Sequence, residues 1–371
     1  MKSSPPAGLV PEKFLKRHWH KKPLLLRQAF PGFAGLLSPR ELMRLACRDD
    51  AQSRLVLRRG RSWELHHGPF RAADFRDLPE RGWSLLVQEV NHFLPEAERL
   101  LASFAFIPLA RLDDLMVSYA PDGGGVGPHF DSYDVFLLQG LGRRRWRISA
   151  QEDRELVPRA PLRILRRFRP EQDWILEAGD ILYLPPRYAH DGVAVGECMT
   201  YSIGFRAPSH QELLTRFLDH LAEATHPPGM YEDPDLKLQR EPARIGAPML
   251  RRVESIISGL NWTRGDILRF LGCHLTEPKP HVFFSPPRSP MTRARFAARL
   301  RRGGARLDPR SRFLYARGIF FMNGDAVEKS GARTATLLKR LANAGELPPC
   351  DPGTEAQALL YRWYLHGYIA A

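Results

Sequence analysis

The sequence predicts an α+β protein in three parts: a double-stranded β-helix of the jelly-roll type, a helical segment and a winged-helix-like unit. From Leu112 to Phe205, short apolar stretches are separated by Gly and Pro turns, a pattern typical of a jelly roll. After Pro208 the apolar residues recur at helical spacing, and from Asp266 onward short helices alternate with strand-like runs. The predicted boundaries of the three parts are 1–206, 207–265 and 266–371.

Length, charge and cysteine usage narrow the class of protein. The 371 residues are long for one domain, and the hydrophobic fraction of 43% is sufficient for a packed core. The net charge of +14 suggests an acidic partner, with nucleic acid as the first candidate. Four widely separated cysteines argue against a disulfide framework or a zinc site and favour a reducing compartment. Apolar runs stay shorter than the roughly 18 residues of a membrane helix, so we expect a soluble, cytoplasmic protein.

Local patterns predict the elements of the first part. Ser38-Pro39-Arg40-Glu41 combines an N-cap serine, a proline in the first turn and an acid at the third helical position, so a helix should begin there. Leu24–Leu26 reads as a short buried strand, residues 53–66 alternate as a strand does, and residues 80–107 read as helical around Pro95. Further strands are predicted at 113–119, 129–139, 143–149, 173–177, 180–184, 191–195 and 198–205.

The rest of the chain is predicted to be mainly helical and strongly basic. Helices are expected around 213–221, 250–260, 266–272, 291–301, 333–343 and 353–365, with strands at 281–284, 313–316 and 319–321. The segment 285–317 holds ten arginines and one acid, Asp308. This segment could follow a phosphate backbone, or it could be a plain solvated surface.

A glycine-rich turn, Gly123–Pro128, leads directly into His129 and Asp131. On a strand, residues two apart point to the same face, so the imidazole and the carboxylate should lie together. His190 follows a strand and a Pro185-Pro186 turn, which could bring it beside them. Two histidines and one carboxylate with open positions are the pattern of a non-haem iron(II) oxygenase. Zinc is a chemical alternative to iron. A simpler alternative is that His129 and His190 are hydrogen-bonded polar residues of the core or of loops.

The strands on either side of this turn offer a cosubstrate site and a substrate site. An oxygenase of this type uses 2-oxoglutarate, and Arg144, which shares the Trp146 face of its strand, could bind the distal carboxylate. Ser118 could hydrogen-bond the same carboxylate. Asp114 and Met116 share the face of Ser118, and Asp114 would suit a cationic substrate. Tyr133 could wall the pocket. The alternatives are that the arginines around Arg144 are solvated, that Asp114 is an ordinary surface carboxylate and that Tyr133 only packs in the core.

Several motifs together resemble a known family. These are Asp113–Ser118, Gly123–Asp131, Tyr133–Phe136, Gln139–Trp146, Gly179–His190 and Trp19–Leu25. In combination they resemble the bacterial ribosomal oxygenases, which are cupins of the JmjC type, and in particular the arginine 3-hydroxylases of large-subunit ribosomal protein sixteen. The resemblance implies a JmjC barrel, a helical dimerisation domain and a winged-helix-like C-terminal domain.

The resemblance also implies roles for single residues. Fe(II) would be held by His129, Asp131 and His190, and 2-oxoglutarate by Arg144 and Ser118. The substrate arginine would be held by Asp114, Met116, Tyr133 and Ser202.

The implied partners are a ribosomal protein of the large subunit and a second copy of the chain, in proximity to ribosomal RNA. The alternatives are hydroxylation of a histidine in another ribosomal protein, and a non-catalytic cupin fused to a nucleic-acid-binding winged helix.

Overall fold

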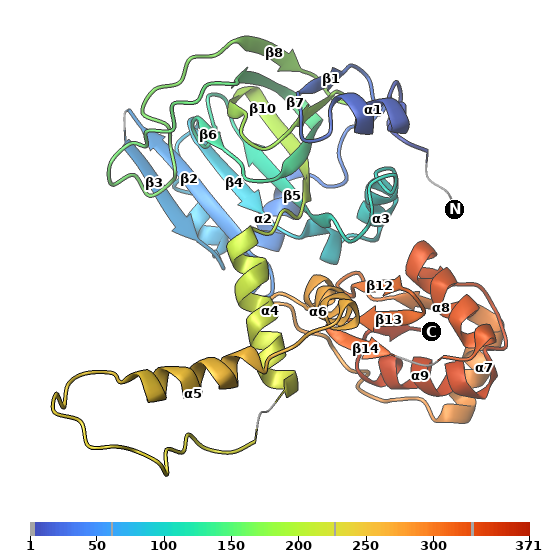
Figure 1. Cartoon of the computed structure of the whole chain (residues 1–371). Helices are drawn as coiled ribbons and strands as arrows, with labels where there is room; N and C mark the ends of the chain where they lie inside the picture. The colour runs from blue at the N-terminus through green and yellow to red at the C-terminus, as the bar shows by residue number, and fades with distance from the viewer. Residues whose placement is uncertain (1–3, 61, 226–227, 328–329) are drawn as a thin grey trace.

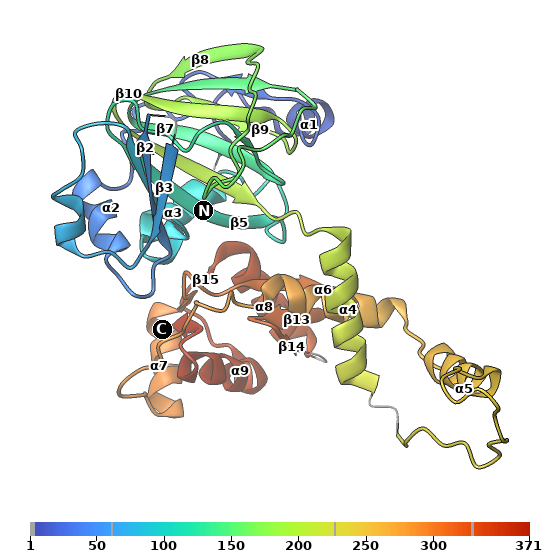
Figure 2. The same cartoon turned by 90° about the vertical axis from the view of Figure 1, so that its left-hand side faces the viewer.

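The computed structural model describes residues 4–60, 62–225, 228–327 and 330–371, which form three parts (Figure 1). A β-barrel with its covering helices takes up the chain as far as residue 205. Helix α4 (His210–Thr225) runs from the barrel toward a C-terminal unit of helices and short strands, and helix α5 (Ala247–Ser258) projects away from both in Figures 1 and 2. No helix in these ranges is long and apolar enough to cross a membrane.

Ten strands form the barrel, and every pair of neighbours is antiparallel. The main order is β1-β9-β7-β10-β5-β4-β2-β3, with β6 paired to β10 and β8 paired to β7. The strands are β1 (Leu24–Leu26), β2 (Ser53–Arg59), β3 (Ser62–His67), β4 (Trp83–Val87), β5 (Leu112–Ala120), β6 (His129–Phe130), β7 (Asp134–Ser149), β8 (Gln172–Leu176), β9 (Ile181–Leu184) and β10 (Ala189–Phe205).

Two strands are longer than the sequence predicts. The stretches predicted at 191–195 and 198–205 form one strand, β10, with a register shift between Val195 and Cys198. Similarly, β7 continues through Gly140 and Gly142, whereas the predicted strand 129–139 is interrupted after Phe130. A glycine inside a strand marks a bulge as readily as an end, and here the glycines permit bulges. Because β7 and β10 pair along nearly their whole length, they carry residues of both halves of the site.

The prediction for residues 80–107 is half wrong. Trp83–Val87 is strand β4, buried along its whole length between β5 and β2, and only α3 (Pro95–Ala102) and the short 3₁₀ turn η2 (Val90–His92) are helical. A fully buried strand and a buried helix both read as apolar runs, so periodicity alone does not separate them. The predicted strand at 281–284 is also wrong, since these residues form a turn and irregular chain.

One face of the barrel sheet packs against helices and the other faces the barrel interior. Leu115, Val117 and Tyr119 of β5 belong to a core shared with α1 (Pro11–Arg17), α2 (Pro39–Ala46) and α3. The predicted start of α2 is confirmed, because Ser38 and Glu41 form a capping box. By alternation, the other residues of β5 point into the barrel.

The C-terminal unit has its own core. Its helices are α6 (Arg264–Thr276), α7 (Arg293–Gly303), α8 (Ala332–Ala344) and α9 (Gly353–Leu365). Its strands are β11 (Ala305–Leu307), β12 (Phe313–Ala316), β13 (Ile319–Met322), β14 (Asp325–Val327), β15 (Glu346–Leu347) and β16 (Ile369–Ala370). Phe296, Leu300, Phe320 and Leu360 are fully buried at its centre. All four cysteines are free.

Candidate functional site

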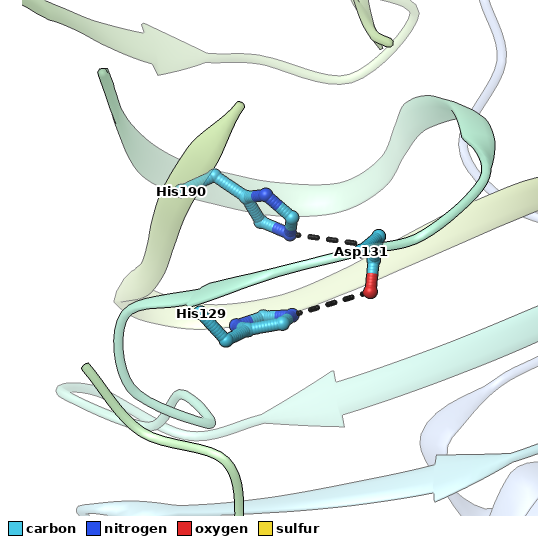
Figure 3. A group of neighbouring side chains, drawn as sticks. All are labelled: His129, Asp131 and His190. Atoms are coloured by element: carbon cyan, nitrogen blue, oxygen red, sulfur yellow. Dashed lines mark ion pairs between the residues drawn. The ribbon is translucent and has the colours of Figure 1, made fainter. Parts of the chain in front are cut away.

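His129, Asp131 and His190 lie close together, with their side chains pointing toward one another (Figure 3). His129 lies directly across from His190 in the pairing of β6 with β10, and the centroids of their rings are 4.3 Å apart. Asp131 Oδ1 is 3.8 Å from His129 Nε2, and Asp131 Oδ2 is 3.5 Å from His190 Nε2. The three ligand atoms all lie within 4.8 Å of one another, as a single metal ion requires.

Hydrogen bonds set both imidazoles in the tautomer that binds metal. His129 Nδ1 is 2.9 Å from the carbonyl oxygen of Gly127, and His190 Nδ1 is 3.1 Å from that of Tyr188. A carbonyl can only accept, so Nδ1 carries the proton and the Nε2 lone pair faces Asp131. Burial and the neighbouring His129 lower the pKa of His190 to about 4, so its ring is neutral at neutral pH. Two imidazoles and one carboxylate suit Fe(II).

The glycine-rich turn is required by close backbone contacts. A Cβ at Gly125 would lie 2.6 Å from the carbonyl oxygen of Gly192, and Gly127 has a φ of 80°, which L side chains rarely adopt. The turn is tied to β10, because Gly123 N donates to Ala194 O and Ala194 N donates to Gly124 O. The residues before His129 therefore fix the strand that presents it.

Arg144 is a buried cation inside the barrel, where its side chain is in reach of an anionic ligand. It is 5% exposed, its Nε donates to Cys198 Sγ at 3.4 Å, and its guanidinium lies over the Trp146 ring. Within the described residues, its Nη2 is buried without a hydrogen-bond partner. A buried donor on a charged group is costly unless a ligand satisfies it, and a carboxylate fits a guanidinium best. The 2-oxoglutarate chain would meet this need.

Ser118 lies on the same inner face of the sheet as Arg144. Ser118 is paired in register with Thr200, two residues from Cys198, which contacts Arg144. The sequence prediction missed Ser84 on β4, whose buried Oγ also has no partner among the described residues. Leu86 pairs with Ser118, so Ser84 also points inward. Recognising β4 as a strand would have been the signal that finds Ser84.

The four predicted substrate residues gather in two neighbouring places. Asp114 Oδ1 and Tyr133 Cε2 lie 3.3 and 3.8 Å from the point where a Cβ on Gly204 would be. Ser202 is paired with Met116, one step further along the same face of β5 and β10. Asp114 is 9% exposed, and burial together with Asp113 raises its pKa to about 6. Tyr133 is 38% exposed, at the edge of the pocket.

Family models identify two parts of the chain. A JmjC domain matches residues 99–213, and a ROXA-like winged helix matches residues 259–370. The barrel with its His-Asp-His group is thus that of a JmjC-domain protein. The matches confirm the predicted fold class: a JmjC-type barrel, a helical segment and a winged-helix C-terminal domain.

Known proteins identify the family more closely. The chain is 38% identical over 278 residues to the ribosomal protein uL16 3-hydroxylase of Escherichia coli K12, which covers 75% of this chain and 74% of that protein. It is 40% identical over 237 residues to a probable ribosomal oxygenase of Haemophilus influenzae, covering 63% of this chain and 56% of that protein. The chain belongs to the ribosomal oxygenase family.

Solved structures match this chain over nearly its whole length. The X-ray structure of E. coli ycfD aligns with a TM-score of 0.86 and 32% identity, and it covers 98% of both chains. The ribosomal oxygenase YcfD in complex with cobalt and 2-oxoglutarate aligns with a TM-score of 0.82, 33% identity and the same coverage. The likeness therefore includes the helical segment and the C-terminal unit as well as the barrel.

Proposed function

We propose that this chain is an Fe(II)- and 2-oxoglutarate-dependent dioxygenase that hydroxylates carbon 3 of an arginine in large-subunit ribosomal protein uL16. The observation that carries the proposal is one barrel interior that holds both a His-Asp-His group and the unpartnered guanidinium of Arg144. The relative in E. coli is named for the 3-hydroxylation of uL16, and a related structure holds cobalt and 2-oxoglutarate.

The metal ligands are His129, Asp131 and His190. As metal ligands, two imidazoles and one carboxylate would partly balance the charge of Fe(II) and leave open positions for a cosubstrate. Bound iron and 2-oxoglutarate supply the chemistry that reduces dioxygen and inserts one oxygen atom into a C–H bond of the substrate. The carbonyl oxygens of Gly127 and Tyr188 keep both rings oriented for this.

Arg144 and Ser118 hold the distal carboxylate of 2-oxoglutarate. Within the barrel the guanidinium is shielded from water, so a charge-assisted pair there is stronger than at the surface. Cys198 and Trp146 fix the guanidinium from two sides. Their contacts orient Nη2 without using it, so the cosubstrate has a preformed partner.

Asp114 binds the guanidinium of the substrate arginine, with Tyr133, Met116 and Ser202 lining the approach. Oδ2 of Asp114 already accepts a hydrogen bond from Glu89 N, and Oδ1 accepts none from the described residues. An anion with one unused oxygen favours arginine over histidine, because a neutral imidazole would leave the carboxylate without a counter-charge.

The test is the mass of the product. Iron-loaded enzyme is incubated with 2-oxoglutarate and a uL16 peptide, and with the same peptide carrying histidine in place of the target arginine. We expect one added oxygen atom on the arginine peptide only, and none with His129→Ala. Oxygen on the histidine peptide alone would assign the enzyme to histidine, and no 2-oxoglutarate turnover with either would favour a non-catalytic binding protein.

Two further features fit this function. We place the domain boundaries at 1–206, 207–265 and 266–371. The second part serves as a dimerisation domain, and the protein acts in the cytoplasm. Helix α5 has no buried residue, and its apolar side chains lie on one face. A second copy of the chain would cover that face, which consists of Met249, Leu250, Val253, Ile256 and Ile257, together with Leu260 just after the helix.

The arginines of α7 would contact ribosomal RNA near the substrate. Arg295, Arg299 and Arg302 are exposed, whereas Phe296 and Leu300 of the same helix are buried. Among the described residues, no acid forms an ion pair with any of these three arginines. Like charges at this helical spacing repel one another. By contrast, three other arginines of the segment 285–317 bind acids: Arg306 pairs with Glu98, Arg310 with Asp308 and Arg312 with Asp113.

A further inference from the structure

The loop after α6 inserts a charged side chain of the C-terminal unit against the barrel. Lys279 Nζ lies 2.9 Å from Glu89 Oε1 and 3.2 Å from Asp113 Oδ1, both of which belong to the barrel part. Pro278 and Pro280 flank Lys279, so the backbone that presents it has little freedom. His281, two residues after Lys279, donates from Nε2 to Glu89 Oε2 at 2.5 Å.

Glu89 connects this loop to the substrate pocket. Its backbone N donates to Asp114 Oδ2 at 3.1 Å, the one hydrogen bond that the Asp114 carboxylate accepts from the described residues. Glu89 has a φ of 53°, in the left-handed region that a non-glycine residue rarely adopts without support from its surroundings. That support comes from the side chain, which is held by Lys279 and His281 from the other unit.

A second set of cations fixes the start of β5. Asp113 Oδ1 lies 3.2 Å from Arg206 Nε and 3.4 Å from Arg312 Nη2, and Arg312 Nη2 also donates to the carbonyl oxygen of Asp113 at 2.6 Å. Arg312 belongs to the C-terminal unit, next to β12. Glu89 donates to the Asp114 carboxylate, and Asp113 precedes Asp114 in the chain. Both Glu89 and Asp113 are therefore held by side chains of the C-terminal unit.

We propose that Lys279 is a positioning residue for Asp114: through Glu89 and Asp113, it keeps the Asp114 carboxylate oriented and charged for a cationic substrate side chain. The C-terminal unit is then part of the apparatus that selects arginine, although it supplies no residue that touches it. The inference rests on the proposed function, because it takes Asp114 as the group that binds the substrate guanidinium.

The charges around Asp114 explain why a cation is needed there. Burial raises the pKa of Asp114 and the neighbouring carboxylate of Asp113 raises it further, whereas Lys279 and the N–H of Glu89 lower it, so that the result is about 6. Lys279 itself stays charged: burial opposes the charge, but Asp113 and Glu89 raise its pKa overall. The charged and titratable groups facing Asp114 are Asp113, Glu89, Tyr133, Lys279 and Arg312.

The experiment compares Lys279→Met with wild-type enzyme over a range of pH. Without Lys279, the carboxylates of Asp113 and Glu89 lose the cation that they share. The pH below which arginine-peptide binding is lost should therefore move up. A shift of about one to two pH units corresponds to a rise of about two- to tenfold in KM at pH 7, with kcat nearly unchanged. At about pH 9 the KM of the variant should return toward that of wild type, because Asp114 is ionised in both.

Binding without turnover gives a second readout. The dissociation constant of the arginine peptide is measured by calorimetry on iron-loaded enzyme under nitrogen, and it should follow the same shifted pH dependence. Lys279→Arg, which keeps the charge, should restore most of the wild-type profile. A rise in KM that is equal at every pH, or no change at all, would overturn the inference.

Two controls separate this inference from a general effect on docking. Arg306→Met removes another ion pair between the two units, that with Glu98, and it should leave the pH profile unchanged. Asp114→Asn should raise KM above about pH 6, where the wild-type carboxylate is ionised. If Asp114→Asn has no effect on KM, the proposed substrate site fails. If Asp114→Asn raises KM but Lys279→Met behaves like Arg306→Met, only the role of Lys279 fails.

Discussion

Arg144 and Arg145 are adjacent in the chain but lie on opposite faces of β7. Arg144 is buried inside the barrel, and its Nη2 has no partner among the described residues. Arg145 lies on the outside and forms a two-pronged ion pair with Asp173 on β8. The two neighbours thus provide a matched pair of variants with the same chemistry and different surroundings.

Arg144→Met should weaken 2-oxoglutarate binding far more than Arg145→Met. Removing one partner of a buried, hydrogen-bonded charge pair costs about 2–5 kcal/mol, so the KM for 2-oxoglutarate should rise by about 30-fold or more. The exposed pair of Arg145 contributes about 0–1 kcal/mol to stability and touches no cosubstrate. The measurement is succinate formation against 2-oxoglutarate concentration. Equal effects of the two substitutions would contradict the assignment of Arg144.

The inward position of Arg144 could be predicted from the sequence because alternation along a strand is local. The clustering of His129, Asp131 and His190 could also be predicted, because these residues lie beside turn residues that mark strand ends. The contacts around Asp114 could not: Glu89 and Lys279 meet only after two units dock, and neither occurs in a recognisable motif. Ser84 was missed for another reason, since its strand is buried on both faces and lacks the period of two.

Acid should destabilise the barrel through His92. Burial, opposed by Glu89, lowers the pKa of His92 from 6.5 to about 4. Below pH 6.5 the unfolded chain binds a proton that the folded chain does not take up until about pH 4. The free energy of unfolding therefore decreases as the pH is lowered from 6.5 to about 4. The loss should reach about 3 kcal/mol for this residue.

Denaturant unfolding at pH 7 and pH 4.5 measures this effect. In His92→Gln the drop in unfolding free energy between the two pH values should be smaller than in wild type by about 2–3 kcal/mol. His66→Gln changes a histidine whose side chain is 56% exposed, and it should leave the drop as in wild type. If His92→Gln and His66→Gln show the same drop, His92 is not the group that titrates.

Dimerisation should depend on the apolar face of α5. Ile256 and Ile257 are 51% and 61% exposed in the single chain, and burying such side chains is worth about 1.5–3 kcal/mol each. Ile256→Asp with Ile257→Asp should therefore give a monomer by light scattering at concentrations where wild type is dimeric. Ile175→Asp places the same charge on an exposed apolar residue of β8 and should not change the mass. A dimer that persists in the double variant would place the interface elsewhere.

RNA binding should depend on the three outward arginines of α7. Replacing Arg295, Arg299 and Arg302 by glutamine removes three cations that no described acid engages. If each contacts a phosphate, the slope of log K against log salt for a ribosomal RNA fragment should become shallower by about 2–3. The KM for a short arginine peptide should not change, because none of the proposed substrate residues belongs to α7, which lies on the side of the C-terminal unit away from α4 (Figures 1 and 2).

The matched control removes three arginines that already have acidic partners. Arg145, Arg166 and Arg167 of the barrel part pair with Asp173, Glu155 and Asp153. Their replacement by glutamine lowers the net charge by the same amount, but these arginines are engaged within the chain and should contribute little to the salt slope. If both triple variants lose RNA affinity equally, net charge alone governs binding; if neither loses it, α7 is a solvated surface. Only a loss of RNA affinity confined to the α7 variant supports a phosphate-binding surface on α7.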